Sequence, residues 1–193
     1  MEIERRFLPV AAASLRAVDE NGKTRRLVGH TAVFNSDSGN LGGFIEQIAP
    51  GAFRDAIPRS DIRALFNHDA SLILGRMKAG TLKVEEDERG LFYDVDLPDT
   101  TTARDLAESV RRGDVDGNSF SFVVEEDRWE KRGDQLLRTV VRVKELFDVG
   151  PVTYPAYAGT TVSARSLERA REQVRGVDWE RFELQAKLRG YSL

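Results

Sequence analysis

The chain has 193 residues, 40% of them hydrophobic and 32% charged, which predicts a soluble globular protein and excludes a disordered chain. The absence of cysteine excludes disulfides, thiolate metal sites and a cysteine nucleophile, and two histidines are too few for a histidine-rich zinc site. A net charge of −3 with no basic patch predicts that nucleic acid is not a partner. The chain has no apolar run of membrane-spanning length and a poor match to a signal peptide at its start, which predicts a cytosolic protein with no membrane partner. The absence of a Gly-rich phosphate loop and of a dinucleotide fingerprint predicts no cofactor.

Short runs of β-forming residues, separated by turn residues, fill the first two-thirds of the chain and predict a β-rich α+β fold. The polar turns at 87–90 and 131–134 each lie between two such runs, and each predicts a hairpin. The expected strands cover 27–34, 62–68, 81–86, 91–97, 120–125, 136–147 and 149–154.

One longer helix is predicted over 102–112, where four apolar residues recur at the spacing of one helical face. Thr101 or Thr102 can cap its start, and Gly113 follows its end. A shorter helix is predicted over 51–57. The apolar residues of the longer helix are Ala103, Leu106, Ala107 and Val110.

The C-terminal part of the chain is dense in charge and keeps only helical spacing. Gly176 is expected to break this helical stretch, and Asp178 to cap a second start. We therefore divide the chain into an N-terminal segment (1–26), a central domain (27–162) and a helical C-terminal extension (163–193). The extension is either a helix packed on the domain or a removable or partner-binding tail, and the sequence leaves both open.

Ser119 is a candidate nucleophile at the start of a predicted strand. Because side chains alternate across a strand, Phe120 and Phe122 share one face, and Ser119 and Ser121 share the other. Gly117 just before it permits an unusual turn or the close approach of a substrate. Taken alone, the pattern is weak and favours a serine on the solvent-facing side of a half-buried strand.

His68 is the candidate general base. It ends the strand predicted over 62–68, on the same face as Ala64 and Phe66. Imidazole is the side chain whose pKa in water suits proton transfer near neutral pH. The only other histidine, His30, lies on an apolar strand face and is interpreted as structural.

A third residue would orient the imidazole and stabilise its charged form. Asp148 and Glu145 are the candidates near a strand end. Asp148 is preferred because it lies among apolar residues, where a charge is costly unless it is paired. Asp69 directly follows His68, and successive strand residues point to opposite faces, so it is not expected to orient the ring.

A series of short motifs in chain order resembles the prohead proteases of HK97-like tailed phages. The series covers roughly 27–157, and its specificity comes from the order of the motifs, since each one is weak singly. The matching segments are 29–35, 42–53, 67–69, 74–76 with 80–82, 90–91, 97–100, 112–114, 117–122 and 149–156.

The resemblance implies a β-barrel of the herpesvirus-protease type with flanking helices. It implies Ser119 as nucleophile, in the Gly-x-Ser-Phe motif, His68 as base, in the Asn-His-Asp motif, and Asp148 as third catalytic residue. Two departures bear on the third residue: the family usually carries Glu at this position, and Gly150 lies in a stretch that lacks the usual Ser. Glu145 therefore stays open as a replacement.

The resemblance also implies a function. It points to a serine endopeptidase that cleaves the scaffolding segment of the phage major capsid protein and itself, inside assembling proheads in the host cytoplasm. It also suggests self-association. From the chemistry of a serine nucleophile we expect an acyl-enzyme mechanism, with backbone oxyanion donors near 159–161 or near Gly75 and Arg76. The alternative is a catalytically inactive scaffold or assembly factor that keeps the protease fold.

Overall fold

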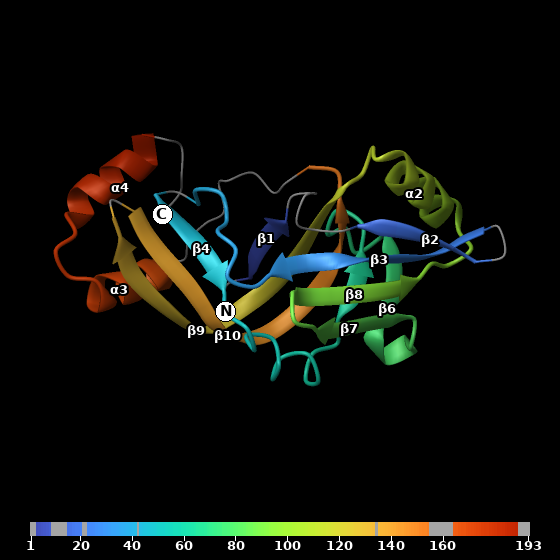
Figure 1. Cartoon of the computed structure of the whole chain (residues 1–193), viewed down its shortest axis with the longest axis horizontal. Coiled ribbons are helices and arrows are strands. Elements are labelled where there is room, and N and C mark those ends of the chain that lie inside the picture. The colour runs from blue at the N-terminus through green and yellow to red at the C-terminus, as the bar shows by residue number, and fades with distance from the viewer. Residues whose placement is uncertain are drawn as a thin grey trace.

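The computed structural model describes residues 3–8, 15–20, 23–41, 43–133, 135–154 and 164–188. Its strands form two sheets, with α2 at one end of the molecule and α3 and α4 at the other (Figure 1). The strands are β1 (Glu4–Leu8), β2 (Arg16–Glu20), β3 (Lys23–Val33), β4 (Phe44–Ile48), β5 (Arg63–Leu65), β6 (Ile73–Arg76), β7 (Leu82–Glu86), β8 (Gly90–Asp96), β9 (Gly117–Arg132) and β10 (Gln135–Val152). The helices are η1 (Met77–Ala79), α2 (Thr101–Arg112), α3 (Ala164–Gln173) and α4 (Trp179–Leu188).

The β-rich α+β class is confirmed, and the expected β-barrel is not. The larger sheet has six strands in the order β1-β9-β10-β5-β6, with β4 also paired to β10, and the smaller has the order β2-β3-β8-β7. Within the described residues neither sheet closes on itself, because the two outermost strands of each are not paired with each other. A barrel needs that closing pair.

Both predicted hairpins are confirmed as antiparallel pairs, β7 with β8 and β9 with β10. The second hairpin is much longer than expected, and it runs through the centre of the larger sheet (Figure 1). The strand predicted over 62–68 is too long, because β5 ends at Leu65. Asn67 and His68 have φ angles of +55° and +57°, and such left-handed residues cannot continue a strand.

The short helix predicted over 51–57 is wrong. The segment folds as consecutive turns. The Ala52 carbonyl accepts from Val143 N at 2.8 Å, and the Ala56 amide, which would donate to that carbonyl in an α-helix, donates to the Phe53 carbonyl at 3.0 Å instead.

The longer helix is confirmed as α2, with its four apolar residues buried. Its start is one residue earlier than expected: Thr100 caps it, accepting a hydrogen bond from the Ala103 amide at 3.3 Å. Gly113 ends it with a φ of +82°, as Gly commonly does after a helix.

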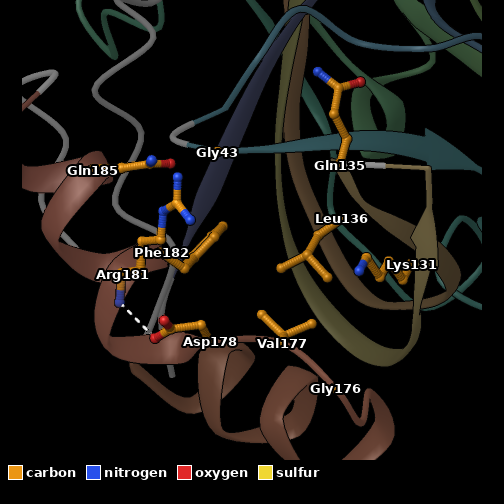
Figure 2. Close-up of a pocket in the computed structure, with 10 residues that line it drawn as sticks. All are labelled: Gly43, Lys131, Gln135, Leu136, Gly176, Val177, Asp178, Arg181, Phe182 and Gln185. Carbon is orange, nitrogen blue, oxygen red and sulfur yellow. Dashed lines mark hydrogen bonds between the residues drawn. The ribbon is translucent and has the colours of Figure 1, made fainter.

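The C-terminal extension folds into two helices with a break that includes Gly176. Asp178 caps α4 as predicted, since its Oδ1 accepts from the Arg181 amide at 3.0 Å (Figure 2). Ala170 and Val174 are buried in a cluster with β-strand side chains. The buried members of this cluster are Phe44, Trp129, Leu136, Ala170 and Val174. In the N-terminal segment, β1 pairs with β9. The boundaries at 26 and 162 stay predictions.

Gly150 is the glycine that brings β5 close to the end of β10. A Cβ atom added at this position would lie 2.1 Å from the Leu65 carbonyl oxygen, far inside contact distance. The serine that the resemblance leads one to expect in this stretch therefore has no room at position 150.

We predict that Gly150→Ala lowers the free energy of unfolding by about 1–3 kcal/mol, the usual cost of overpacking a well-packed site. Urea denaturation measures the change. Gly39→Ala is the matched control, because nothing lies within 4 Å of a Cβ there, and its effect is expected to stay within about 0.5 kcal/mol. Equal stabilities of the two variants would contradict the prediction.

Candidate active site

Ser119 lies on β9 with its side chain on the face opposite to Phe120 and Phe122, as the alternation predicts. That face is not open to solvent, however. Ser119 is 0% exposed and Ser121 is 2% exposed. The sequence did not predict this burial. On this side of the sheet β1 pairs with β9, with Phe7 opposite Ser119.

His68 reaches the site from a loop rather than from a strand. The two left-handed residues Asn67 and His68 turn the chain sharply after β5. Asn67 connects this turn to the end of β10 by two hydrogen bonds. Its backbone N–H donates to the Pro151 carbonyl at 3.0 Å, and its side-chain Oδ1 accepts from Thr153 N at 2.8 Å. Asn tolerates the left-handed region better than most residues, which is the sequence signal that could have found the turn.

The three predicted site residues form a continuous series of hydrogen bonds. His68 Nε2 lies 2.6 Å from Ser119 Oγ, and His68 Nδ1 lies 2.5 Å from Asp148 Oδ1. The imidazole is largely enclosed, with its side chain 9% exposed. A ring held in this way by a carboxylate at Nδ1 can accept a proton at Nε2 from the serine hydroxyl.

Asp148 is held in place by the sheet and by a second serine. It pairs with Ser121 across the β9–β10 ladder, and the Ser121 hydroxyl donates to its Oδ2. Ser121 was not identified from the sequence as part of the site. Its position two residues after Ser119, on the same strand face, is the signal that could have indicated it.

The other acids considered from the sequence do not contact His68 in this structure. Glu145 lies opposite Val123 on the ladder, before the bulge that precedes Asp148. Asp69 accepts hydrogen bonds from the amide and hydroxyl of Ser71, at 2.8 and 2.6 Å. The argument from strand alternation against Asp69 was wrong, because His68 is not in a strand.

His30 lies in the smaller sheet, on β3. Its Nε2 is 2.8 Å from Asp87 Oδ2, and its ring packs against Phe92 at 5.3 Å between centroids. Its carbonyl accepts from Asn118 Nδ2 at 3.1 Å, a contact that ties β3 to β9 beside Ser119. These contacts agree with the structural role expected of His30.

Of the two oxyanion donors considered, the segment 159–161 lies outside the described residues. In the other, the Arg76 amide donates to Thr81 Oγ1 at 3.0 Å, and Gly75 pairs with Ala64 inside the sheet. A donor near these residues stays a prediction.

A buried cluster of charges joins β1 to the sheet beside the site. Arg6 Nε lies 2.6 Å from Glu46 Oε1, and Arg6 Nη2 lies 2.5 Å from Glu4 Oε2. Arg138, which is fully buried, lies 2.6 Å from Glu4 Oε2, 3.0 Å from Glu46 Oε2 and 2.9 Å from Asp127 Oδ2. Burial alone would raise the pKa of Glu4, but the attraction of Arg138 and Arg6 outweighs it and lowers that pKa.

A pocket of about 430 Å³ lies at the far end of the β9–β10 hairpin, between α4 and the sheet (Figure 2). Phe182 and Leu136 face into it, with Lys131 and Arg181 at its sides. None of the three site residues lines this pocket. Among the described residues there is no group of three or more His, Cys, Asp or Glu side chains able to hold a metal ion, and no helix long and apolar enough to cross a membrane.

Comparison with known proteins adds one match. A family described as caudovirus prohead serine protease matches residues 11–173. The match includes Ser119, His68 and Asp148 and begins after β1. No curated protein and no solved structure matches the chain.

The buried charges around Glu4 predict that the free energy of unfolding depends on pH below neutrality. Because the pKa of Glu4 is lowered in the folded chain, its stabilising effect is complete above the ordinary value of 4.5 and is lost as the pH falls through the lower folded value. We predict that unfolding free energy, measured by urea denaturation at a series of pH values, falls less steeply below pH 4.5 in Glu4→Gln than in the wild type. Parallel curves for the two proteins would contradict this.

Proposed function

Since the chain belongs to the family of caudovirus prohead serine proteases, we propose that Ser119, His68 and Asp148 are its catalytic residues and that it cleaves peptide bonds during prohead maturation. The observation that carries the proposal is the hydrogen-bond series from Ser119 Oγ through both ring nitrogens of His68 to Asp148.

The chemistry follows from the hydrogen-bond partners of His68. His68 Nε2 takes the hydroxyl proton while Ser119 Oγ bonds to the carbonyl carbon of the substrate peptide. Asp148 accepts from Nδ1–H and stabilises the imidazolium, and Ser121 holds the second carboxylate oxygen. The imidazolium then gives its proton to the leaving amine, and water, deprotonated by the same ring, releases the acyl group from Ser119.

The finer assignments belong to the same proposal. The substrates are the scaffolding segment of the phage major capsid protein and the chain itself, and the reaction takes place inside assembling proheads in the host cytoplasm. Self-association and a relationship to the herpesvirus-protease barrel, inferred from the resemblance alone, stay predictions.

We predict that Ser119→Ala and His68→Ala each abolish processing of the capsid protein and of the chain itself, because each removes one partner of the proton transfer. Coexpression with the capsid protein, followed by mass spectrometry of both, measures the loss. A thermal melt monitored by circular dichroism checks that each variant stays folded. Continued processing by folded Ser119→Ala would eliminate this residue as the nucleophile, whereas absence of processing by the wild type would favour the inactive scaffold.

The third residue is tested by a matched pair of amide substitutions on β10. Asp148→Asn is expected to lower the rate of peptide cleavage by roughly a factor of 10⁴, the loss that follows when the orienting acid of such a triad becomes an amide. Glu145→Gln, three residues away on the same strand, is expected to leave the rate near that of the wild type. A larger loss in Glu145→Gln would transfer the role to that residue.

A further inference from the structure

We propose that β1 occupies the substrate-binding site beside Ser119, and that Glu46 and Arg138 select the side chains of the strand bound there. The free chain is then blocked by its own N-terminal strand. A substrate that replaces β1 would be an extended peptide with a basic residue at the position of Arg6 and an acidic residue two positions before it. The inference rests on the proposed function, because it takes Ser119 as the nucleophile.

The first argument is the enclosure of Ser119. A nucleophile must reach a peptide carbonyl from outside, yet Ser119 is 0% exposed. Its Oγ also lies 2.8 Å from the Arg6 carbonyl oxygen, to which the hydroxyl can donate. A hydroxyl has one proton, so the Arg6 carbonyl competes for it with Nε2 of His68. Cleavage of another chain therefore requires β1 to leave.

The second argument is the place of β1 in the sheet. It pairs antiparallel with β9 from Glu4 opposite Phe122 to Leu8 opposite Asn118, and it ends the sheet on that side. Without it, the stretch of β9 that contains Ser119 becomes an edge strand with unpaired backbone groups. An extended peptide can add to such an edge, with main-chain hydrogen bonds giving affinity and alternate side chains giving specificity.

The third argument is the pair of side-chain partners that the site offers. Glu46 faces the guanidinium of Arg6 through two oxygens, at 2.6 and 2.9 Å, a bidentate contact that suits arginine in particular. Arg138 contacts both oxygens of Glu4, at 2.6 and 3.0 Å. Arg6 also lies over the Phe122 ring, 5.6 Å from its centroid. Glu46 and Arg138 therefore recognise the side chains at two alternate positions of the bound strand, those of Arg6 and Glu4.

The fourth argument concerns the cost of release. Glu4 and Arg6 leave together, and their charges balance each other. Behind them, Arg138 stays 3.0 Å from Glu46 and 2.9 Å from Asp127, and Asp127 keeps a second cation, Arg169, at 3.1 Å. Release of β1 therefore leaves no single unpaired charge buried in the sheet, which is the expensive outcome for a buried ion pair.

The test is the rate at which a fluorophosphonate labels Ser119 in the full chain. Arg6→Gln removes the charge that Glu46 holds, and we expect labelling roughly tenfold faster or more, since breaking a buried pair weakens the docking of β1 by at least that factor. Arg5→Gln is the matched control, because Arg5 is its neighbour on β1 with an exposed side chain, and it is expected to label at the wild-type rate. Labelling of folded Arg6→Gln at the wild-type rate would overturn the inference.

Selectivity is tested on Arg6→Gln by competition. A free peptide with the sequence of residues 3–8 is expected to slow the labelling, and the same peptide with its Glu4 and Arg6 exchanged is expected to have much less effect. Equal protection by both peptides would overturn the selective role of Glu46 and Arg138.

Deuterium exchange in the wild-type chain tests the release of β1 without relying on the reactivity of Ser119. It also tests the inference if Arg6→Gln fails to fold. Amides of β1 are expected to exchange through a local opening, faster than amides shared by β9 and β10. Exchange of all three strands at one rate would overturn the inference, since β1 would leave only on global unfolding. If β1 opens but Ser119 is not labelled in any variant, the result would contradict the proposed function while still supporting the release of β1.

Discussion

The register between β9 and β10 is the constraint on which the site depends. It sets Ser119 opposite Gly150 and Ser121 opposite Asp148, so that the candidate nucleophile and acid lie on one face of neighbouring strands. A shift of one residue would turn one set of side chains to the other face. The bulge between Leu146 and Asp148 contributes directly, because it changes which residues of β10 share the face of Ser119.

The two central strands supply Ser119 and Asp148 but not the histidine. His68 must contact both side chains, so it has to come from a segment outside β9 and β10. The loop after β5 supplies it through two consecutive left-handed residues, Asn67 and His68, a conformation that costs free energy for a side chain other than glycine. Hydrogen bonds between Asn67 and residues at the end of β10, one donated in each direction, offset that cost. The close approach that Gly150 permits brings β5, and hence this loop, to the same end of β10.

The features predicted correctly from the sequence are those with local signals. Alternating β-forming residues and polar turn residues were enough to predict both hairpins. The spacing of apolar residues, together with capping residues, was enough to predict α2 and the cap by Asp178 at the start of α4. The strand predicted over 62–68 failed because its alternation continues beyond the point where backbone pairing ends at Leu65. The burial of Ser119 and the open edges of the sheets depend on contacts between distant segments, such as Arg6 with Ser119, and no local pattern encodes them.

The side chains that hold β1 also explain why a charged strand suits this position better than an apolar one. An apolar strand would bind the edge of β9 through burial alone, which distinguishes poorly among hydrophobic sequences. Buried ion pairs contribute little net stability relative to apolar packing, but a wrong or missing partner is costly. Glu46 and Arg138 can therefore exclude strands of the wrong charge pattern while holding the right one only moderately. A strand held in this way is both specific and replaceable, which is what the proposed role of β1 at the substrate-binding site requires.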